Sequence, residues 1–547
     1  MKIQNVLIVG GGTSGWFTAA SLLKLCPHIN VSLIESEDHP IIGVGESTLG
    51  QINDFFHLLE LNDDEWMRDT GSTYKVNIRF NDFYKVGETW DYPFGTSHER
   101  MYEMQHGWMS WFALNYHKPE KFHRGTFATT FNSVGHLAKY NKLTWQDRVW
   151  NPQSDSAYHM DATRMGQWFK KNRCKSIVEK GNYHTGTVVG ATKDEHGFIK
   201  SVVTDDGRHF EADMFVDCTG FKSLLLEQEL GVPFHSFHAN DGGCLLSDRA
   251  IATHMPHAED DESPDSYRKR EVINTTNCTA IENGWTWDVP LWDRAGAGYV
   301  HSSDFATVEE AEGQLYNYLL KTRGKKRADQ AEFKTIPFRS GKHEKSWYKN
   351  VCAVGLSNVF VEPLEATGLL CTHEQILRLC TALSSREGLI TNSEKQMVNL
   401  VCDLEIEGFK NFVASHYAFT ARETPYWRAV SEDIDYDFVT GFNDNLFVRY
   451  ASEKYVANEV IYNGQTFDDH NDGPRYVAAG MGFNPICKHT LELNKIHNQT
   501  MTDLTSESMD EDERRIDEWN EEMYNYCMSI PTSYEFQKNT IYKEDYV

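Results

Sequence analysis

Residues 3–15 of the chain have the sequence Ile-Gln-Asn-Val-Leu-Ile-Val-Gly-Gly-Gly-Thr-Ser-Gly. The apolar run over 3–9 predicts a short strand, and Trp16–Leu25 has helical spacing with small residues that suit close packing. Between them lies the pattern Gly10-x-Gly12-x-x-Gly15. The first glycine allows a tight turn, the second lets a pyrophosphate approach the backbone, and the third allows close helix–strand packing. With a second strand at Val31–Ile34, this start predicts a nucleotide-binding strand–turn–helix–strand unit.

Glu35 ends the second strand, 20 residues after Gly15. An acidic side chain at this place can bind a ribose 2′-hydroxyl and disfavours a 2′-phosphate. Thr13 and Ser14 lie in the turn, where the start of the helix offers partial positive charge to phosphates. The motif therefore predicts FAD or NAD rather than NADP, and it does not by itself separate FAD from NAD.

Later segments favour FAD. Phe215–Gly220 is an apolar run that ends in Cys-Thr-Gly, as is typical of FAD-binding sheets, and Val351–Leu356 predicts a similar strand with Leu356 near the cofactor. Pro363–Gly368 follows at a predicted helix start. The segment Gly296-Ala297-Gly298 lacks the third glycine and the preceding strand of a second nucleotide turn. We therefore expect one FAD site and no nicotinamide site.

The strands of this sheet are far apart in sequence, at Thr187–Val189, Met214–Val216 and Val351–Val354, which implies long insertions between them. We predict an α/β fold with α+β insertions: a Rossmann-like FAD-binding sheet of the aromatic-monooxygenase type with a largely helical substrate-binding region. The predicted domains are an FAD-binding module over 1–385, insertions into it at about 50–180 and 230–335, and a mostly helical C-terminal region over 386–547 with an acidic tail. Within the helical part, Glu374–Leu383 and Val398–Ser415 predict helices.

The composition excludes several classes of partner. The formal net charge of −27 argues against nucleic acid and anionic membranes, which both need a basic surface. No signal peptide or transmembrane segment is predicted. Eleven cysteines without a C-x-x-C pair predict no metal site and favour reduced thiols in the cytoplasm. The acidic stretches Glu259–Glu262 and Asp510–Glu522 predict an exposed loop and a solvated helix or tail.

Four further segments carry a family resemblance. They are Gly43–Thr48 (Gly-Val-Gly-Glu-Ser-Thr), Tyr74–Phe80 (Tyr-Lys-Val-Asn-Ile-Arg-Phe), Gly284–Pro290 (Gly-Trp-Thr-Trp-Asp-Val-Pro) and Phe360–Gly368 (Phe-Val-Glu-Pro-Leu-Glu-Ala-Thr-Gly). Together with the glycine turn they resemble the flavin-dependent halogenases of the tryptophan halogenase family, over residues 5 to about 430. The third segment matches the family signature G-W-x-W-x-I-P with Val in place of Ile.

The resemblance implies the chemistry and the catalytic residues. FADH2, O2 and halide would yield hypohalous acid, and Lys75 would carry the halogen to an aromatic carbon. A lysine suits this role because burial lowers the pKa of an ammonium group and a neutral amine is nucleophilic. Glu365 would stabilise the cationic ring intermediate and remove its proton.

The resemblance also implies the binding residues. Gly45, Glu46 and Ser47 belong to a strap that links the flavin and substrate sites, and Thr367 and Gly368 would bind halide largely through backbone groups. Trp285 and Trp287 project to one side of an extended segment and would line the passage beside the flavin.

Three departures from the family pattern leave the substrate open. Ala366 replaces the usual Ser, and Tyr92-Pro93-Phe94 replaces His-Pro-Phe, so that Tyr92 and Phe94 would form one side of an aromatic sandwich. The C-terminal substrate segment is shortened, although Trp427 can still stack on a flat substrate. Tryptophan is therefore one candidate among indoles, phenols and other electron-rich aromatics.

Two alternatives to a halogenase remain at this stage. A flavin-dependent aromatic monooxygenase would need its substrate open to the flavin, which the two-Trp motif disfavours. A catalytically inactive FAD-binding protein would not need both Lys75 and Glu365. For a halogenase the expected partners are the aromatic substrate, halide, O2 and a separate NAD(P)H-dependent flavin reductase, and a homodimer is compatible with the resemblance.

Overall fold

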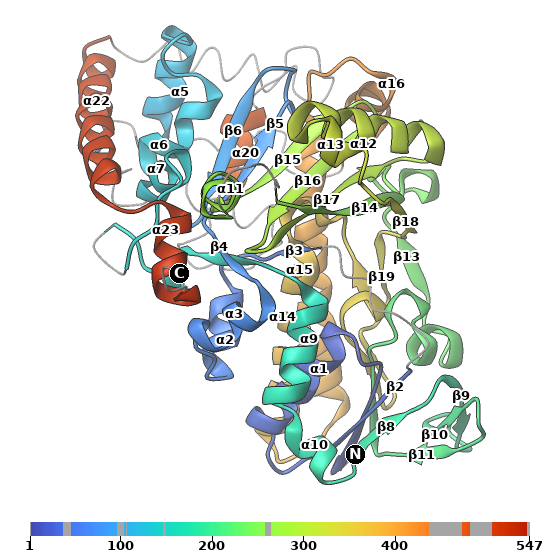
Figure 1. The fold of residues 1–547 in the computed structure, drawn as a ribbon. Helices are drawn as coiled ribbons and strands as arrows, with labels where there is room; N and C mark the ends of the chain where they lie inside the picture. Colours follow the sequence, from blue (N-terminus) through green and yellow to red (C-terminus); the bar gives the residue numbers. More distant parts are fainter. Residues whose placement is uncertain are drawn as a thin grey trace. The chain divides into compact units, whose positions relative to one another are not determined.

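The computed structural model describes residues 2–36, 45–95, 103–104, 107–145, 149–257, 264–436, 473–481 and 506–543. The chain forms two compact units (Figure 1). Unit 1 consists of Met1–Thr70, Met160–Gly242 and Phe338–Glu407, and unit 2 consists of Gly71–His159, Gly243–Pro337 and Gly408–Val547. Our sequence boundaries lay near 50, 180, 230, 335 and 386. The units change instead after residues 70, 159, 242, 337 and 407.

Unit 1 is built around a six-stranded sheet with the order β20-β21-β12-β1-β2-β8. The central strand β1 pairs in parallel with β2 and with β12. The strands are β1 (Asn5–Val9), β2 (Asn30–Glu35), β8 (Tyr183–Thr185), β12 (Met214–Asp217), β20 (Trp347–Tyr348) and β21 (Val351–Ala353). β1 and β12 are almost entirely apolar because both faces of a central parallel strand are buried.

One strand of this sheet was assigned wrongly from the sequence. We predicted Thr187–Val189, but β8 ends at Thr185, and Gly186 then donates its N–H to the carbonyl of Glu35. The chain next enters β9 in a separate three-stranded sheet, in which all pairs are antiparallel. That sheet contains β9 (Val188–Lys193), β10 (Ile199–Thr204) and β11 (His209–Glu211). A strand-like composition does not specify which sheet a strand joins.

Helices α1, α9 and α14 pack side by side in unit 1 (Figure 1). Their bounds are α1 (Thr13–Leu25), α9 (Ala162–Asn172) and α14 (Thr367–Ser385). The predicted helix at Glu374–Leu383 is confirmed and begins earlier, at Thr367. The other elements of unit 1 are β3 (Glu46–Ser47), α2 (Ile52–Leu58), α3 (Asp63–Thr70), α10 (Lys175–Glu179) and the small sheet of β13 (Phe234–Ser236), β19 (Gly341–His343) and β22 (Val359–Phe360).

Unit 2 contains a seven-stranded sheet in which every neighbouring pair is antiparallel except β15 and β5. Its order is β18 (Lys334–Pro337), β14 (Arg249–Pro256), β17 (Arg294–His301), β16 (Gly284–Pro290), β15 (Thr275–Ile281), β5 (Asn77–Asn81) and β6 (Thr89–Pro93). A second, antiparallel pair joins β4 (Thr73–Lys75) to β7 (Ala157–Met160). This pair carries Lys75.

Helix α12 (Val308–Arg323) covers part of one face of the seven-stranded sheet. A capping box of Thr307 and Glu310 starts it, and Gly324 follows its end. Its buried residues pack on the apolar side chains of β14 and β17. The remaining helices include α5 (Trp108–His117), α6 (Phe127–Phe131), α7 (Ser133–Lys139), α8 (Pro152–Asp155), α11 (Pro264–Glu271), α13 (Lys325–Ala328), α15 (Asn392–Ala418), α16 (Pro425–Arg428), α20 (Gly473–Met481), α22 (Ser506–Ser529) and α23 (Ser533–Gln537).

The acidic segment near the C-terminus is helical, as predicted, but only one side of it is solvated. Helix α22 packs on α5 and α7, and Ile516 and even Asp512 are buried. Lys118 and Lys121 both form ion pairs with Glu513. The predicted loop Glu259–Glu262 lies outside the described residues.

Neither unit's described helices include one with the length and apolar character that a membrane span requires. The same part of the chain holds no cluster of His, Cys, Asp and Glu side chains that could bind a metal ion. Ten cysteines are described there, and all are free thiols.

Candidate active site

The glycine turn of unit 1 has the geometry of a dinucleotide site. Gly10 has φ +114°, and a Cβ there would lie closer than 3.0 Å to the carbonyl group of Cys218. A Cβ at Gly15 would lie equally close to the carbonyl oxygen of Gly10. By contrast, apart from its neighbours in the chain, no atom of the described residues lies within 4 Å of a Cβ placed at Gly12. The turn is therefore closed by Gly10 and Gly15 and open beside Gly12, where a pyrophosphate requires room.

Two further contacts hold the turn in place. Thr13 Oγ1 donates to the carbonyl of Ala162 at 2.9 Å. Gly355 has φ +68°, and a Cβ there would lie closer than 3.0 Å to Ser14 Oγ. Leu356 therefore lies beside the start of α1, but in a 3₁₀ turn rather than in the strand we predicted, because β21 already ends at Ala353.

Glu35 lies against the glycine turn. A Cβ at Gly11 would overlap with the Glu35 carboxylate. Glu35 Oε1 accepts hydrogen bonds from Lys170 Nζ at 2.6 Å and from the Tyr183 hydroxyl at 2.7 Å. The sequence analysis missed these two partners, which come from α9 and β8, and no local pattern marks them. The other carboxylate oxygen, Glu35 Oε2, lies against Gly11 of the glycine turn.

Glu46 of the strap has an unusual acidity. Burial, and next the negative charge of Asp161, raise the pKa of its carboxyl group to about 7. Asp161 is the N-cap of α9 and accepts a hydrogen bond from the backbone N–H of Arg164 at 2.9 Å. Gly45, directly before Glu46, has φ +80°, a conformation that favours glycine.

Glu365 and the two predicted halide residues lie at the start of α14. Glu365 ends a 3₁₀ turn and is fully buried, and Thr367 begins the helix. Between them Ala366 has φ +56°, which is uncommon for a residue with a side chain and marks a strained corner. Apart from the backbone of its own helix, no atom of the described part of the chain lies within 4 Å of a Cβ placed at Gly368. The N-terminus of this helix offers backbone N–H groups and partial positive charge, which suit an anion.

Lys75 is fully buried on β4 of unit 2. Its ammonium nitrogen lies 4.9 Å from the centroid of the Phe94 ring. His159, on the neighbouring strand β7, is within hydrogen-bonding distance of Thr73 Oγ1 at 3.2 Å and of Thr276 Oγ1 at 2.9 Å. Burial, and next the charge of Lys75, hold the pKa of His159 well below its ordinary value. Lys75 is thus accompanied by a neutral imidazole.

The predicted substrate residues do not all lie together. Phe94, directly after β6, lies beside Lys75, and its ring centroid is 5.8 Å from that of Tyr92 on β6. Tyr92 stacks on Tyr476 of α20 at 5.5 Å, a partner that the sequence analysis missed. Trp427 is fully buried elsewhere in unit 2, and its Nε1 donates to the carbonyl of Ile281 at 2.6 Å. A stacking role for Trp427 stays a prediction.

Trp285 and Trp287 are both buried on β16, with ring centroids 6.3 Å apart, which confirms that they share one side of the strand. Gly298 is paired with Trp287 across β16 and β17. The glycine leaves the room that the Trp287 ring occupies.

These features define the class of protein. Unit 1 is an α/β dinucleotide-binding unit with an open turn at Gly12, and unit 2 buries a lysine beside aromatic rings. Because no described group competes for the space at Gly12, the residues fit FAD.

Comparisons with known proteins agree. The family model described as tryptophan halogenase matches residues 5–460. Tryptophan 6-halogenase SttH of Streptomyces toxytricini is 32% identical, over 78% of this chain and 80% of its own. The apo structure of VirX1 superimposes with a TM-score of 0.84 at 35% identity and covers both chains completely. BrvH, a flavin-dependent halogenase from Brevundimonas sp. BAL3, has a TM-score of 0.77 at 26% identity, over 98% of this chain and 99% of its own.

The chain belongs to the tryptophan halogenase family. The predicted family, fold class and flavin-dependent halogenase activity are thereby confirmed, and FAD is the expected cofactor. The roles of individual residues are a separate question.

Proposed function

We propose that the protein halogenates an electron-rich aromatic substrate, either indole-like, as tryptophan is, or phenolic, and that Lys75 delivers the halogen with the assistance of Glu365. The observation that carries the proposal is the position of Lys75, fully buried with its ammonium group over Phe94. A lysine has little reason to be buried beside aromatic rings unless its amine takes part in chemistry there.

FADH2, when bound, would supply the two electrons and two protons that, with one further proton, convert O2 and halide into hypohalous acid and water. In the proposal Lys75 then holds hypohalous acid by hydrogen bonding, or carries the halogen as a haloamine, and presents it to the ring carbon. The ring loses a proton as the carbon–halogen bond forms, and the second product is water. Glu365 stabilises the positive charge on the ring and accepts that proton.

The neighbouring residues support this division of roles. Backbone groups at Thr367 and Gly368 suit halide because they lie in the first turn of α14. The Phe94 ring adjoins the lysine and the Tyr92 ring adjoins Phe94, so the two rings offer an apolar surface for a flat substrate. Trp285 and Trp287 would line the passage for the hypohalous acid.

We further propose a cytoplasmic enzyme that receives FADH2 from a separate flavin reductase, because the sequence contains one dinucleotide turn and lacks a second. The purified protein should therefore not oxidise NADH by itself. Rapid NADH consumption without an added reductase would contradict this part of the proposal.

The decisive experiment combines the protein with FAD, a flavin reductase, NADH, O2 and a panel of indoles and phenols, in chloride, bromide or iodide. Mass spectrometry should detect halogenated product that depends on both the halide and the protein. Hydroxylated product would indicate a monooxygenase, and unchanged substrate across the panel would indicate a binding protein. Catalase should be present, so that free peroxide does not halogenate the substrate without the enzyme.

A further inference from the structure

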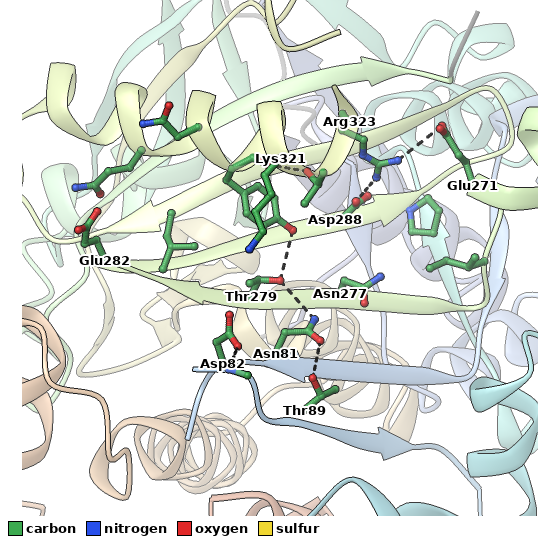
Figure 2. Close-up of a pocket in the computed structure, with 18 of the residues that line it drawn as sticks. Asn81, Asp82, Thr89, Glu271, Asn277, Thr279, Glu282, Asp288, Lys321 and Arg323 are labelled. Atoms are coloured by element: carbon green, nitrogen blue, oxygen red, sulfur yellow. Dashed lines mark hydrogen bonds and ion pairs between the residues drawn. The ribbon is translucent and has the colours of Figure 1, made fainter. Parts of the chain in front are cut away.

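A polar pocket of about 740 Å³ lies in unit 2, between α12 and the strands β5, β15 and β16 (Figure 2). Its volume is within the usual range of small-molecule sites. Asp288 of the signature strand β16 lines it, and neither Trp285 nor Trp287 does. In the register of β16 and β17, Asp288 is opposite Ala297, which packs towards α12, whereas Trp287 is opposite Gly298. The pocket therefore lies on the other face of the sheet from the two tryptophans.

The lining combines neutral groups that hydrogen-bond with charged side chains, among them Arg270, and a few apolar residues. Asn81, Asn277 and Thr279 project from the strands. Helix α12 contributes Gln314, Asn317, Tyr318 and Lys321, whose spacing places them on one side of the helix. The amide and hydroxyl side chains both donate and accept hydrogen bonds, whereas the ammonium group of Lys321 only donates. The pocket thus suits a ligand rich in hydroxyl groups and poorly suits a flat, apolar aromatic.

Most charges in the pocket already have ionic partners. Arg323 forms an ion pair with Asp288. The negative charge of Asp288 raises the pKa of the guanidinium group and outweighs burial, which lowers it. Glu271 accepts from Arg327 at 2.8 Å and is 3.0 Å from His257 Nδ1. At this end of the pocket the acids and bases therefore neutralise one another.

The acids at the other end are also partly compensated. Asp82 accepts a hydrogen bond from the backbone N–H of Gly87 at 2.7 Å. Burial lowers the pKa of the Arg422 guanidinium group, and the negative charges of Asp82 and Glu282 oppose this shift. Neither acid is therefore an isolated charge.

Lys321 differs from these groups. Figure 2 shows its side chain extending from α12 over Thr279 into the pocket. Within the part of the chain that the structure describes, the Lys321 ammonium has no ion pair or hydrogen bond, and the side chain of Asn277 has no hydrogen bond. Beside the paired charges, the pocket therefore presents the solvent-exposed ammonium group of Lys321 and the amide of Asn277, neither of which has a partner among the described residues.

We propose that this pocket binds a small polyhydroxylated anion, such as a sugar acid or a sugar phosphate. Lys321 pairs with the carboxylate or phosphate by charge-assisted hydrogen bonds. The side chains of Asn277 and Thr279 and the polar side of α12 bind the hydroxyl groups. The site is separate from the proposed halogenation chemistry and does not depend on it.

The test is isothermal titration of the full-length protein with four probes that share one carbon skeleton. Gluconate and glucose 6-phosphate carry an anionic group, glucose is neutral and glucosamine is cationic. We expect one of the two anions, or both, to bind at one site per chain, and the stronger of the two identifies the anionic group. Glucose and glucosamine should bind at least about tenfold more weakly, as expected for loss of a charge-assisted hydrogen bond.

Two matched variants assign the site. Lys321→Gln should weaken binding of the anion about tenfold or more, while Lys334→Gln, which removes an exposed lysine outside the pocket, should leave it unchanged. Asn277→Ala provides a second, uncharged test with a smaller loss. The proposal is overturned if neither anion binds at ~10 mM, if Lys321→Gln binds as wild type does, or if glucosamine binds as tightly as the anions. Thermal melts of each variant show whether it is folded.

Discussion

The indole ring of Trp287 occupies the space where a side chain at Gly298 would be. The two residues are paired across β16 and β17, and a Cβ at Gly298 would lie closer than 3.0 Å to Cη2 of Trp287 and to the carbonyl oxygen of Ile251. In the sequence, Gly298 was only part of an incomplete nucleotide pattern. In the structure it positions the second tryptophan of the family signature.

Gly298→Ala should therefore lower the free energy of unfolding by about 2 kcal/mol, because the added methyl group displaces Trp287 or the strand of Ile251. Urea denaturation with tryptophan fluorescence measures this change. The matched control is Gly313→Ala in α12, where no described atom beyond the helix backbone lies within 4 Å of the new Cβ. This variant should be neutral or stabilising by about 0.5–1 kcal/mol. Equal stability of the two variants would show that the Trp287 contact is not tight.

Substitutions in the glycine turn should separate cofactor binding from folding. Gly12→Val should weaken FAD binding at least about tenfold while the melting temperature of the apoprotein changes little, because no described residue other than its chain neighbours lies within 4 Å of a Cβ at Gly12. Gly15→Ala should instead destabilise the fold, since its Cβ would meet the carbonyl oxygen of Gly10. Flavin fluorescence titration and thermal melts report the two effects. Undiminished FAD affinity in Gly12→Val would place the pyrophosphate elsewhere.

Glu46 should make the stability of the apoprotein depend on pH. Its pKa is raised from 4.5 to about 7, so the native state keeps a proton that the unfolded state loses. This contribution is fully present below pH 4.5 and is lost as the pH rises to about 7. At about 1.4 kcal/mol per pKa unit, the loss reaches at most about 3.5 kcal/mol, and partial solvent access reduces it.

Glu46→Gln should accordingly flatten the stability profile between pH 5 and 7 and should be more stable than wild type at about pH 8. Urea denaturation across this pH range, without FAD, measures both effects. Glu195→Gln, at an exposed position of unit 1, is the control and should keep the wild-type slope. A wild-type slope in Glu46→Gln would mean that another group is responsible.

Substitutions of Lys75 and Glu365 should reduce product formation in different ways. Lys75→Ala should abolish enzymatic product, because the halogen loses its carrier, while FADH2 oxidation continues and hypohalous acid or peroxide escapes. Parallel measurements of flavin absorbance and of product by mass spectrometry separate the two outcomes. Lys334→Ala, an exposed lysine in the same unit, should retain full activity. Near-normal product in Lys75→Ala would end the proposed halogen transfer.

Glu365→Gln keeps the size of the side chain but removes the base, so product formation should slow by about 10²–10³-fold. The double variant should be hardly slower than Lys75→Ala, because groups that act in one step are not additive. If the two losses multiply instead, the two residues serve separate steps.

Local sequence was sufficient for the features that depend on neighbouring residues. The glycine spacing predicted the β1–turn–α1–β2 unit with Glu35 at its end, and the period of two in Gly284–Pro290 placed Trp285 and Trp287 on one side. Both follow from backbone geometry over fewer than 40 residues. The prediction that Thr187–Val189 joins the nucleotide-binding sheet was wrong, because the strand with which a segment pairs depends on residues far away in the chain.

Contacts between distant segments required the folded chain. Lys170 and Tyr183 bind Glu35, Gly355 adjoins Ser14, and Tyr476 stacks on Tyr92, and each pair joins residues that are more than 100 positions apart. No periodicity marks such partners, because packing selects them by shape and hydrogen bonding after the strands have found their neighbours. The same reason explains Gly298. The need for a glycine at this position arises only when β17 pairs with β16, because the ring of Trp287 then occupies the space of a side chain.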